Sequence, residues 1–140
     1  MKFSKATNYA LHTMVHLAME PTSEAVKVEE LANRQMLSPT YLSKILTKLS
    51  KAGLIMSTPG VKGGYRLLRA PEDCTFLDVT KAIEGQESLL NCTMSHDGKW
   101  NKNCLIERAM SDVEDKMKEE LSHKNIAGIV KQAENREKEN

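Results

Sequence analysis

The most reactive side chains in this 140-residue sequence are those of three cysteines, Cys74, Cys92 and Cys104. The number is odd, and the chain opens without the basic, apolar and small-residue order of a signal peptide, so a framework of structural disulfides is not expected. Thiol, metal or redox chemistry and simple burial are the uses that fit. For Cys74, between a hairpin and a helical pattern, we expect burial as a small hydrophobic residue.

Residues 86–101 form a polar stretch in which apolar residues show no periodicity. Cys92 lies within this stretch, and Cys104 follows three residues after its end. A loop of this length is usually functional or disordered. His96, inside the stretch, could add a nitrogen donor to the two thiols. Zinc sites show tightly paired cysteines, whereas eleven residues separate this pair, so the spacing does not single out zinc.

Two histidines, His12 and His16, stand four residues apart in a first predicted helix over residues 4–19, and Asn8 lies one turn before them on the same face. Such a pair could hold a metal ion, although packing is the commoner use of helical histidines. The apolar stripe expected to be buried in this helix consists of Leu11, Met14, Val15 and Ala18.

A helix over about residues 38–52 has the clearest start and end signals. Ser38 suits the N-cap, Pro39 suits the first helical position, and Gly53 follows the end. The apolar residues that recur at the spacing of one buried face are Leu42, Ile45, Leu46 and Leu49. The helix should therefore pack by this face and leave its lysines in solvent.

A hairpin over about residues 54–70 follows, with a strand on either side of the turn Pro59–Gly64. The glycines of this turn permit positive φ and the close approach of backbone to a ligand. A short helix is predicted over residues 28–35, before the helix at 38–52. Two helices joined by a short turn and followed by a hairpin are typical of a winged helix-turn-helix.

Basic side chains concentrate in the first half of the chain. Residues 1–71 carry ten Lys and Arg against four Asp and Glu, a net charge of +6, while residues 72–140 carry ten against fifteen, a net charge of −5. A basic winged helix suits the phosphates of duplex DNA. The residues expected to contact DNA are Ser38, Thr40, Tyr41, Lys44, Lys48, Lys62 and Arg66. The plainer alternative for the helix lysines is an ordinary solvated face.

The second half of the chain is predicted to be helical outside residues 86–101. A capping-box pattern at Thr75–Asp78 opens a helix that Gly85 ends. A long helix is expected over residues 102–123, and its narrow apolar stripe favours pairing with a second copy. That stripe consists of Ile106, Met110, Val113, Met117 and Leu121. A short helical segment over 126–130 should precede a frayed tail from residue 131.

Several motifs resemble those of one known family: Asn8-Tyr9-Ala10-Leu11, Ser38 to Gly53, Gly60-Val61-Lys62-Gly63-Gly64-Tyr65-Arg66-Leu67, and Leu77-Asp78-Val79 with Ile83-Glu84-Gly85. Over nearly its whole length the chain resembles the Rrf2 family of bacterial winged-helix regulators, the IscR-, NsrR- and CymR-like proteins. The resemblance implies a homodimer on a pseudo-palindromic operator, and we expect the chain to act as a repressor. It also implies a mainly α fold with a small β-hairpin wing: a winged-helix DNA-binding domain over 1–85, a sensor loop over 86–101, and a dimerisation helix and tail over 102–140.

The same resemblance implies an iron–sulfur site in the sensor loop. Many members hold a cluster on three cysteines separated by five residues each, and here Cys92 and Cys104 match the outer two while Gly98 stands at the middle position. The substitute ligands that other members suggest are His12 and, less strongly, Asn8, His96 and Glu107. Two thiolates with an imidazole is a ligation that a two-iron cluster accepts, so 2Fe–2S is expected ahead of 4Fe–4S.

Other readings stay open. Cys92 and Cys104 could form a thiol switch without a cluster. The chain could also be a cluster-free regulator, or a winged-helix interaction module controlled by a partner protein or a small molecule. An enzyme is not expected, because no nucleophile has an evident base and orienting partner. No apolar run approaches the about 18 residues of a membrane span, which favours a cytoplasmic protein without a membrane partner.

Overall fold

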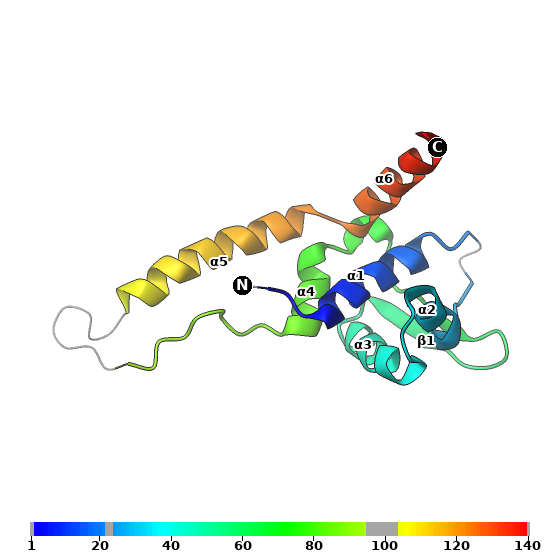
Figure 1. Cartoon of the computed structure of the whole chain (residues 1–140), viewed down its shortest axis with the longest axis horizontal. Helices are drawn as coiled ribbons and strands as arrows, with labels where there is room; N and C mark the ends of the chain where they lie inside the picture. The colour runs from blue at the N-terminus through cyan, green and yellow to red at the C-terminus, as the bar shows by residue number, and fades with distance from the viewer. Residues whose placement is uncertain (1, 22–23, 95–103, 140) are drawn as a thin grey trace.

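The computed structural model describes residues 2–21, 24–94 and 104–139. Helices make up most of this part, and one antiparallel pair of strands follows the third helix. The elements, drawn in Figure 1, are α1 (Lys5–Ala18), α2 (Val28–Gln35), α3 (Pro39–Lys51), β1 (Ile55–Thr58), β2 (Gly64–Leu67), the short 3-10 helix η1 (Pro71–Asp73), α4 (Phe76–Glu84), α5 (Leu105–His123) and α6 (Ile126–Glu139).

The helices α2 and α3 form the predicted helix-turn-helix. Met36 ends α2 in the left-handed conformation, with φ 57°. The Ser38 hydroxyl then accepts the Tyr41 N–H at 3.1 Å and caps the start of α3. All four apolar residues expected to be buried in α3 are buried: Leu42, Ile45, Leu46 and Leu49. Gly53 follows the helix at φ 76°, which glycine adopts without strain.

The wing is a hairpin of β1 and β2, with Ile55 paired to Leu67 and Thr58 to Gly64. The segment before α2 pairs with β2 through one antiparallel bridge, in which Val26 and Tyr65 exchange two backbone hydrogen bonds of 2.8 Å. A Cβ on Gly64 would lie 2.5 Å from the Val26 backbone. The close approach that we expected of a ligand is therefore made by the chain itself at this glycine.

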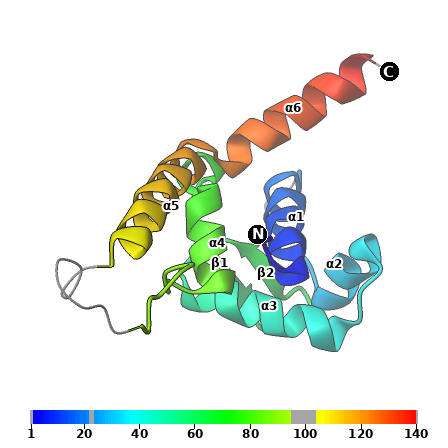
Figure 2. The ribbon, with the colours of Figure 1, turned by 60° about the vertical axis from the view of Figure 1, so that its left-hand side comes forward.

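The core lies where α1 crosses α3, α4 and the first turns of α6 (Figure 2). Its fully buried large side chains include Met14, Leu31, Leu42, Leu46, Leu49, Leu54, Ile55, Val79 and Ile126. The stripe predicted for α1 was only partly right. Ala10, Met14 and Leu17 are buried, while Leu11, Val15 and Ala18 are half-buried at its flank. Because α1 packs against α3, α4 and α6, its most buried face lies about one residue away from the predicted stripe.

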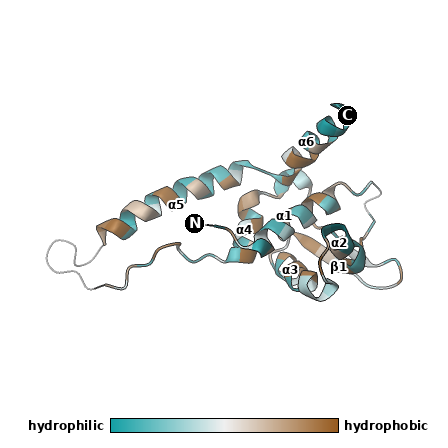
Figure 3. Ribbon diagram, viewed as in Figure 1, coloured by the Kyte–Doolittle hydropathy of each residue, from teal (hydrophilic) through white to brown (hydrophobic). Residues whose placement is uncertain are grey.

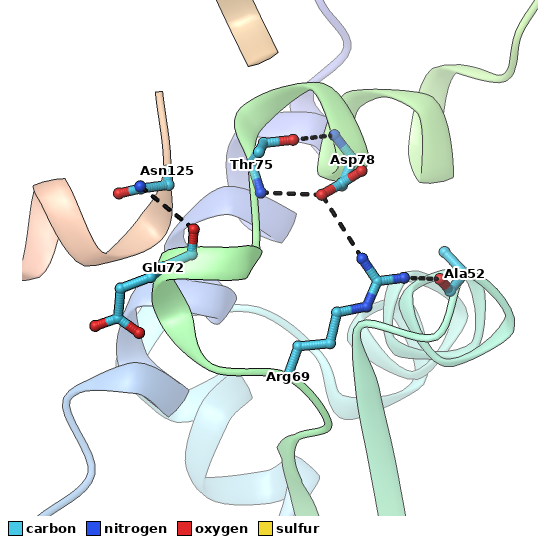
Figure 4. Close-up of polar contacts among 6 residues, drawn as sticks. All are labelled: Ala52, Arg69, Glu72, Thr75, Asp78 and Asn125. Atoms are coloured by element: carbon cyan, nitrogen blue, oxygen red, sulfur yellow. Dashed lines mark hydrogen bonds and ion pairs between the residues drawn. The ribbon is translucent and has the colours of Figure 1, made fainter. Parts of the chain in front are cut away.

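A polar joint connects the wing, α3, α4 and α6 (Figure 4). The predicted capping box forms, with Thr75 N–H donating to Asp78 Oδ2 at 3.1 Å and Asp78 N–H donating to Thr75 Oγ1 at 3.0 Å. Arg69, just after the wing, lies 3.8 Å from Asp78 and donates to the Ala52 carbonyl at the end of α3. On the other side, Asn125 donates to the Glu72 carbonyl at 3.4 Å.

Residues 86–94 and α5 together form an arm that extends away from this core. The segment leaves α4, and α5 returns in the opposite direction beside it (Figure 1). The long helix expected from residue 102 begins at Leu105, with Cys104 as its N-cap, and residues 102–103 lie outside the described part. Among the described residues, no helix combines the length and apolar character needed to cross a bilayer.

The tail expected to fray from residue 131 is instead helical, because α6 continues to Glu139. The Asn125 side chain accepts the Gly128 N–H at 2.8 Å, and Ile126 and Val130 pack against the core. Once a packed first turn is formed, each further residue adds a hydrogen bond at little extra entropic cost. The apolar anchor at its start therefore carries the helix into the polar tail.

Candidate nucleic-acid interface and thiol pair

The outer face of α3 presents the polar side chains expected to meet DNA. Thr40, Lys44 and Lys48 are exposed, and the Tyr41 ring is 38% exposed. Tyr41 is also held in place, since its ring meets that of Tyr9 edge to face with centroids 6.0 Å apart. The N–H groups at the start of α3 add a partial positive charge beside these side chains.

The wing presents the second basic surface. Lys62 and Arg66 are exposed, and Val61 at the tip is 88% exposed. Lys62 and Arg66 line an open groove of about 500 Å³ between the wing and the start of α2, where Glu24 and Glu30 also lie. The groove is thus of mixed charge, and both cations of the wing lie along it.

Some cations of the domain are held in ion pairs within the fold, and others are not. Arg34 bridges Glu20 and Glu30 at 3.3 and 2.6 Å, and Arg69 pairs with Asp78. Within the described part of the chain, the four cations expected at DNA form no ion pair with a carboxylate within 4.0 Å: Lys44, Lys48, Lys62 and Arg66. Their charges are therefore open to phosphates.

Cys92 and Cys104 are brought together at the start of α5. The Cys104 sulfur, at the N-cap, accepts the Glu107 N–H at 3.4 Å. The Glu107 carboxylate in turn accepts the Cys92 N–H at 3.1 Å, and the two thiols are close enough to shift each other's pKa. Both cysteines are half-buried but not closed off, so reagents in solvent can reach them. The three residues form one compact unit.

The surroundings make the two thiols unequal. Donation from the Glu107 backbone N–H, joined by the hydrogen bond from Cys92, lowers the pKa of Cys104 below the usual thiol value. For Cys92, the Met94 backbone N–H acts to lower the pKa, but the hydrogen bond with Cys104 and weaker contributions outweigh it and raise the pKa. Cys104 is therefore the better nucleophile, as expected of a thiol at a helix N-terminus.

The remaining ligand candidates do not join the thiols in the described part of one chain, where no group of three His, Cys, Asp or Glu side chains could hold a metal. His12 and Asn8 are exposed on α1, and His12 Nδ1 lies 2.8 Å from the Asn8 carbonyl oxygen. This contact fixes Nδ1 as the donor and leaves Nε2 as the acceptor. His96 lies outside the described residues.

Cys74 is fully buried, as predicted, and desolvation raises the pKa of its thiol, so it is a packing residue and no part of the thiol pair. One residue of the arm escaped sequence reasoning altogether. Glu114 on α5 is only 7% exposed, and both its carboxylate oxygens lie 3.3 Å from the Leu89 backbone nitrogen. No signal in the sequence distinguished it from the other acids of this charged helix.

Comparisons with known proteins agree with this geometry. The family model Rrf2, described as an iron-dependent transcriptional regulator, matches residues 3–132. A candidate HTH-type transcriptional regulator of Lactococcus lactis, YffB, is 35% identical over 93% of this chain and 87% of its own length.

Two solved structures resemble this one across most of its length. T. potens IscR aligns with a TM-score of 0.73 and 28% identity over 95% of this chain and 88% of that one. CymR, the global cysteine regulator of B. subtilis, aligns with a TM-score of 0.72 and 26% identity over 94% and 98%. The predicted winged-helix fold is confirmed. With its helix-turn-helix, its wing and a family match over nearly its whole length, the chain belongs to the Rrf2 family of DNA-binding transcription regulators, and it is not an enzyme.

Proposed function

We propose that this chain is a homodimeric repressor whose affinity for its operator depends on the chemical state of Cys92 and Cys104. The observation that carries the proposal is that Glu107 hydrogen-bonds to both residues at the start of α5, accepting the Cys92 N–H and donating its own N–H to the Cys104 sulfur. Two half-buried thiols of unequal acidity that solvent can reach are suited to ligate a metal centre or to be oxidised. Either event would alter the arm.

For DNA binding, we infer that α3 enters the major groove and that the wing lies beside the backbone. The exposed residues Thr40, Tyr41 and Lys44 on the first turns of α3 are suited to base edges and phosphates. Lys62 and Arg66 are suited to phosphates or to the minor groove. Ser38 would contribute chiefly through the capped helix start, because its hydroxyl is already bound to the Tyr41 N–H. An occupied operator would exclude polymerase, which is why we infer repression.

For the dimer, the support is an apolar stripe on α5 that one chain leaves uncovered. The exposed fractions of its first half are 50% for Leu105, 58% for Ile106, 44% for Met110 and 62% for Val113. Figure 3 shows these apolar bands along the part of α5 that lies beyond the domain. We infer that a second α5 covers the stripe, as in helix pairs with one apolar seam.

The thiol pair has two chemical uses. As iron ligands, Cys92 and Cys104 would supply two thiolates, and Glu107 is the nearest carboxylate. The described part of one chain offers fewer donors than a cluster requires, and our candidate for a further donor is His12 of a second subunit, through Nε2. A bound iron–sulfur group would supply one-electron redox chemistry and sensitivity to oxidants. Without iron, the pair can form a disulfide.

The deciding experiment is an absorption spectrum of protein purified without oxygen, with iron and sulfide counts. Visible absorption that is lost in Cys92→Ala establishes a cluster. If His12 is a ligand, His12→Ala shifts the spectrum and the matched variant His16→Ala does not. A colourless protein that cannot be reconstituted with iron would favour the disulfide switch. Alkylation and mass spectrometry before and after treatment with oxidant would detect that disulfide. Iron-free protein with a redox-inert pair contradicts the proposal.

A further inference from the structure

The segment 86–94 is attached to α5 by backbone hydrogen bonds to carboxylates. Cys92 N–H donates to Glu107 Oε2 at 3.1 Å, and Leu89 N–H donates to the two oxygens of Glu114, each at 3.3 Å. The segment has no helix or strand of its own. Two of its backbone donors, at Leu89 and Cys92, are therefore satisfied by side chains of the helix.

The spacing of these two contacts matches the geometry of both partners. Seven residues of an α-helix rise about 10.5 Å, and side chains seven apart differ by only about 20° around the axis. Leu89 and Cys92 are three apart, and three residues of chain can reach at most about 10 Å. Glu114 and Glu107 are seven apart. The segment bends at Leu89 and runs antiparallel to α5, and it meets one carboxylate at each contact.

Apolar packing does little to hold Leu89 in this position. Leu89 is 56% exposed, and residues 85–89 line a cavity of about 330 Å³ between α4 and α5. Glu114, by contrast, is only 7% exposed. Lys118 Nζ lies 3.6 Å from its carboxylate and offsets the negative charge. A buried carboxylate is retained where its hydrogen bonds matter, because burying one without partners is costly.

We propose that Glu107 and Glu114 form a two-step ladder that sets the register of residues 86–94 on α5, and that Glu114 is a positioning residue for Cys92. Glu114 never touches either sulfur. It holds the chain three residues before Cys92, so that the Cys92 thiol is delivered to Cys104 at the start of the helix. The consequence for sensing rests on the proposed function, but the positioning itself does not.

The test measures how readily the two thiols combine. In a glutathione buffer, the Cys92 and Cys104 thiols lose two electrons and two protons and form one disulfide, while one oxidised glutathione becomes two molecules of reduced glutathione. The equilibrium constant gives the effective concentration of one thiol at the other. We expect Glu114→Ala to lower it about tenfold, the effect of one lost hydrogen bond to a charged group.

Two variants serve as controls. Glu114→Gln keeps an acceptor oxygen of the same reach and should fall between the wild type and Glu114→Ala, because a neutral amide oxygen accepts a weaker hydrogen bond than a carboxylate. Glu120→Ala removes an exposed carboxylate from the same helix and should have no effect. The ladder is overturned if Glu114→Ala leaves the equilibrium unchanged, or if Glu114→Gln falls as far as Glu114→Ala.

Amide hydrogen exchange supplies a reading that does not depend on redox chemistry. The Leu89 amide should be protected in the wild type and lose its protection in Glu114→Ala, while the Cys92 amide should respond most to Glu107→Ala. If Glu114→Ala does not fold, the wild type decides, since a Leu89 amide exchanging at the rate of an open chain contradicts the ladder. A DNA affinity that does not change with the state of the thiols would contradict the proposed function and leave the positioning role of Glu114 intact.

Discussion

In the winged-helix domain, Leu42, Leu46 and Leu49 are fully buried, whereas on the arm Ile106, Met110 and Val113 remain 44–62% exposed. Apolar packing fixes the position of α3, and two carboxylates hold residues 86–94. Packing of this density tolerates little displacement, while a few hydrogen bonds can be exchanged for others at small cost. The comparison explains why one region suits a rigid reader of DNA and the other suits a switch.

The largest effect that tests this contrast is the loss of a core side chain. Leu46→Ala should lower the free energy of unfolding by about 2–5 kcal/mol, because it leaves a cavity in a packed core. Val113→Ala on the arm should act through assembly, so its effect should be absent at dilutions where the chain is monomeric and should grow to a plateau as protein concentration rises. Chemical denaturation at several concentrations separates the two. Equal, concentration-independent losses would mean that the arm is packed within one chain.

The next effect concerns DNA. Lys44→Ala and Arg66→Ala should each weaken binding to duplex DNA and reduce the slope of log affinity against log salt by about 0.9, because each removes one phosphate contact. Lys131→Ala, an exposed lysine on α6, is the matched control and should leave the slope unchanged. Fluorescence anisotropy across a salt series measures all three. A slope indifferent to Lys44 and Arg66 would remove them from the interface.

A smaller effect is expected at the joint of Figure 4. Arg69 and Asp78 are 3.8 Å apart with side chains 43% and 36% exposed, so solvent and salt screen the pair. Arg69→Met should therefore lower stability by at most about 1 kcal/mol, and less in high salt. Thermal melts at low and high salt measure the difference. A loss of several kcal/mol would show that the joint belongs to the rigid domain and is no adjustable contact.

The smallest effect is a pH dependence from α1. Burial, and then the charges of Arg34 and His12, lower the pKa of His16 below its ordinary value of 6.5. The unfolded chain therefore binds this proton more tightly than the folded chain, and protonation favours unfolding. Stability should be full above pH 6.5 and should fall as pH drops from there through the lower, folded pKa. His16→Gln should flatten this part of the curve of stability against pH. Chemical denaturation at several pH values measures the change.

Most of the domain could be predicted from local patterns, because its helices combine clear caps with complete apolar faces. The bounds of α2 and the buried set of α3 agree with the sequence analysis. The central face of α1 was off by one residue, since packing on several sides decides which residue is innermost. The extent of α6 was missed because its first turn is anchored by Asn125 and Ile126, which a polar tail does not reveal.

The candidate site was less predictable. The sequence could pair Cys92 with Cys104, but no periodicity signals that an irregular segment lies against a helix through its backbone. Glu114 looked like one more surface acid on a charged helix. Only the position of Leu89 beside it identifies a contact, and such contacts between distant residues leave no mark in composition or spacing on one element alone.

The central claim is that the Cys92–Cys104 pair sets operator affinity. The most direct test enriches duplexes from a random DNA library, separately with protein kept anaerobic and with protein exposed to oxidant, and then titrates each enriched duplex with both forms. We predict that the wild type binds its enriched duplex with at least about tenfold different affinity in the two states, a coupling of about 1.4 kcal/mol. Cys92→Ser should bind equally in both. A wild-type affinity that is the same before and after oxidation would contradict the account.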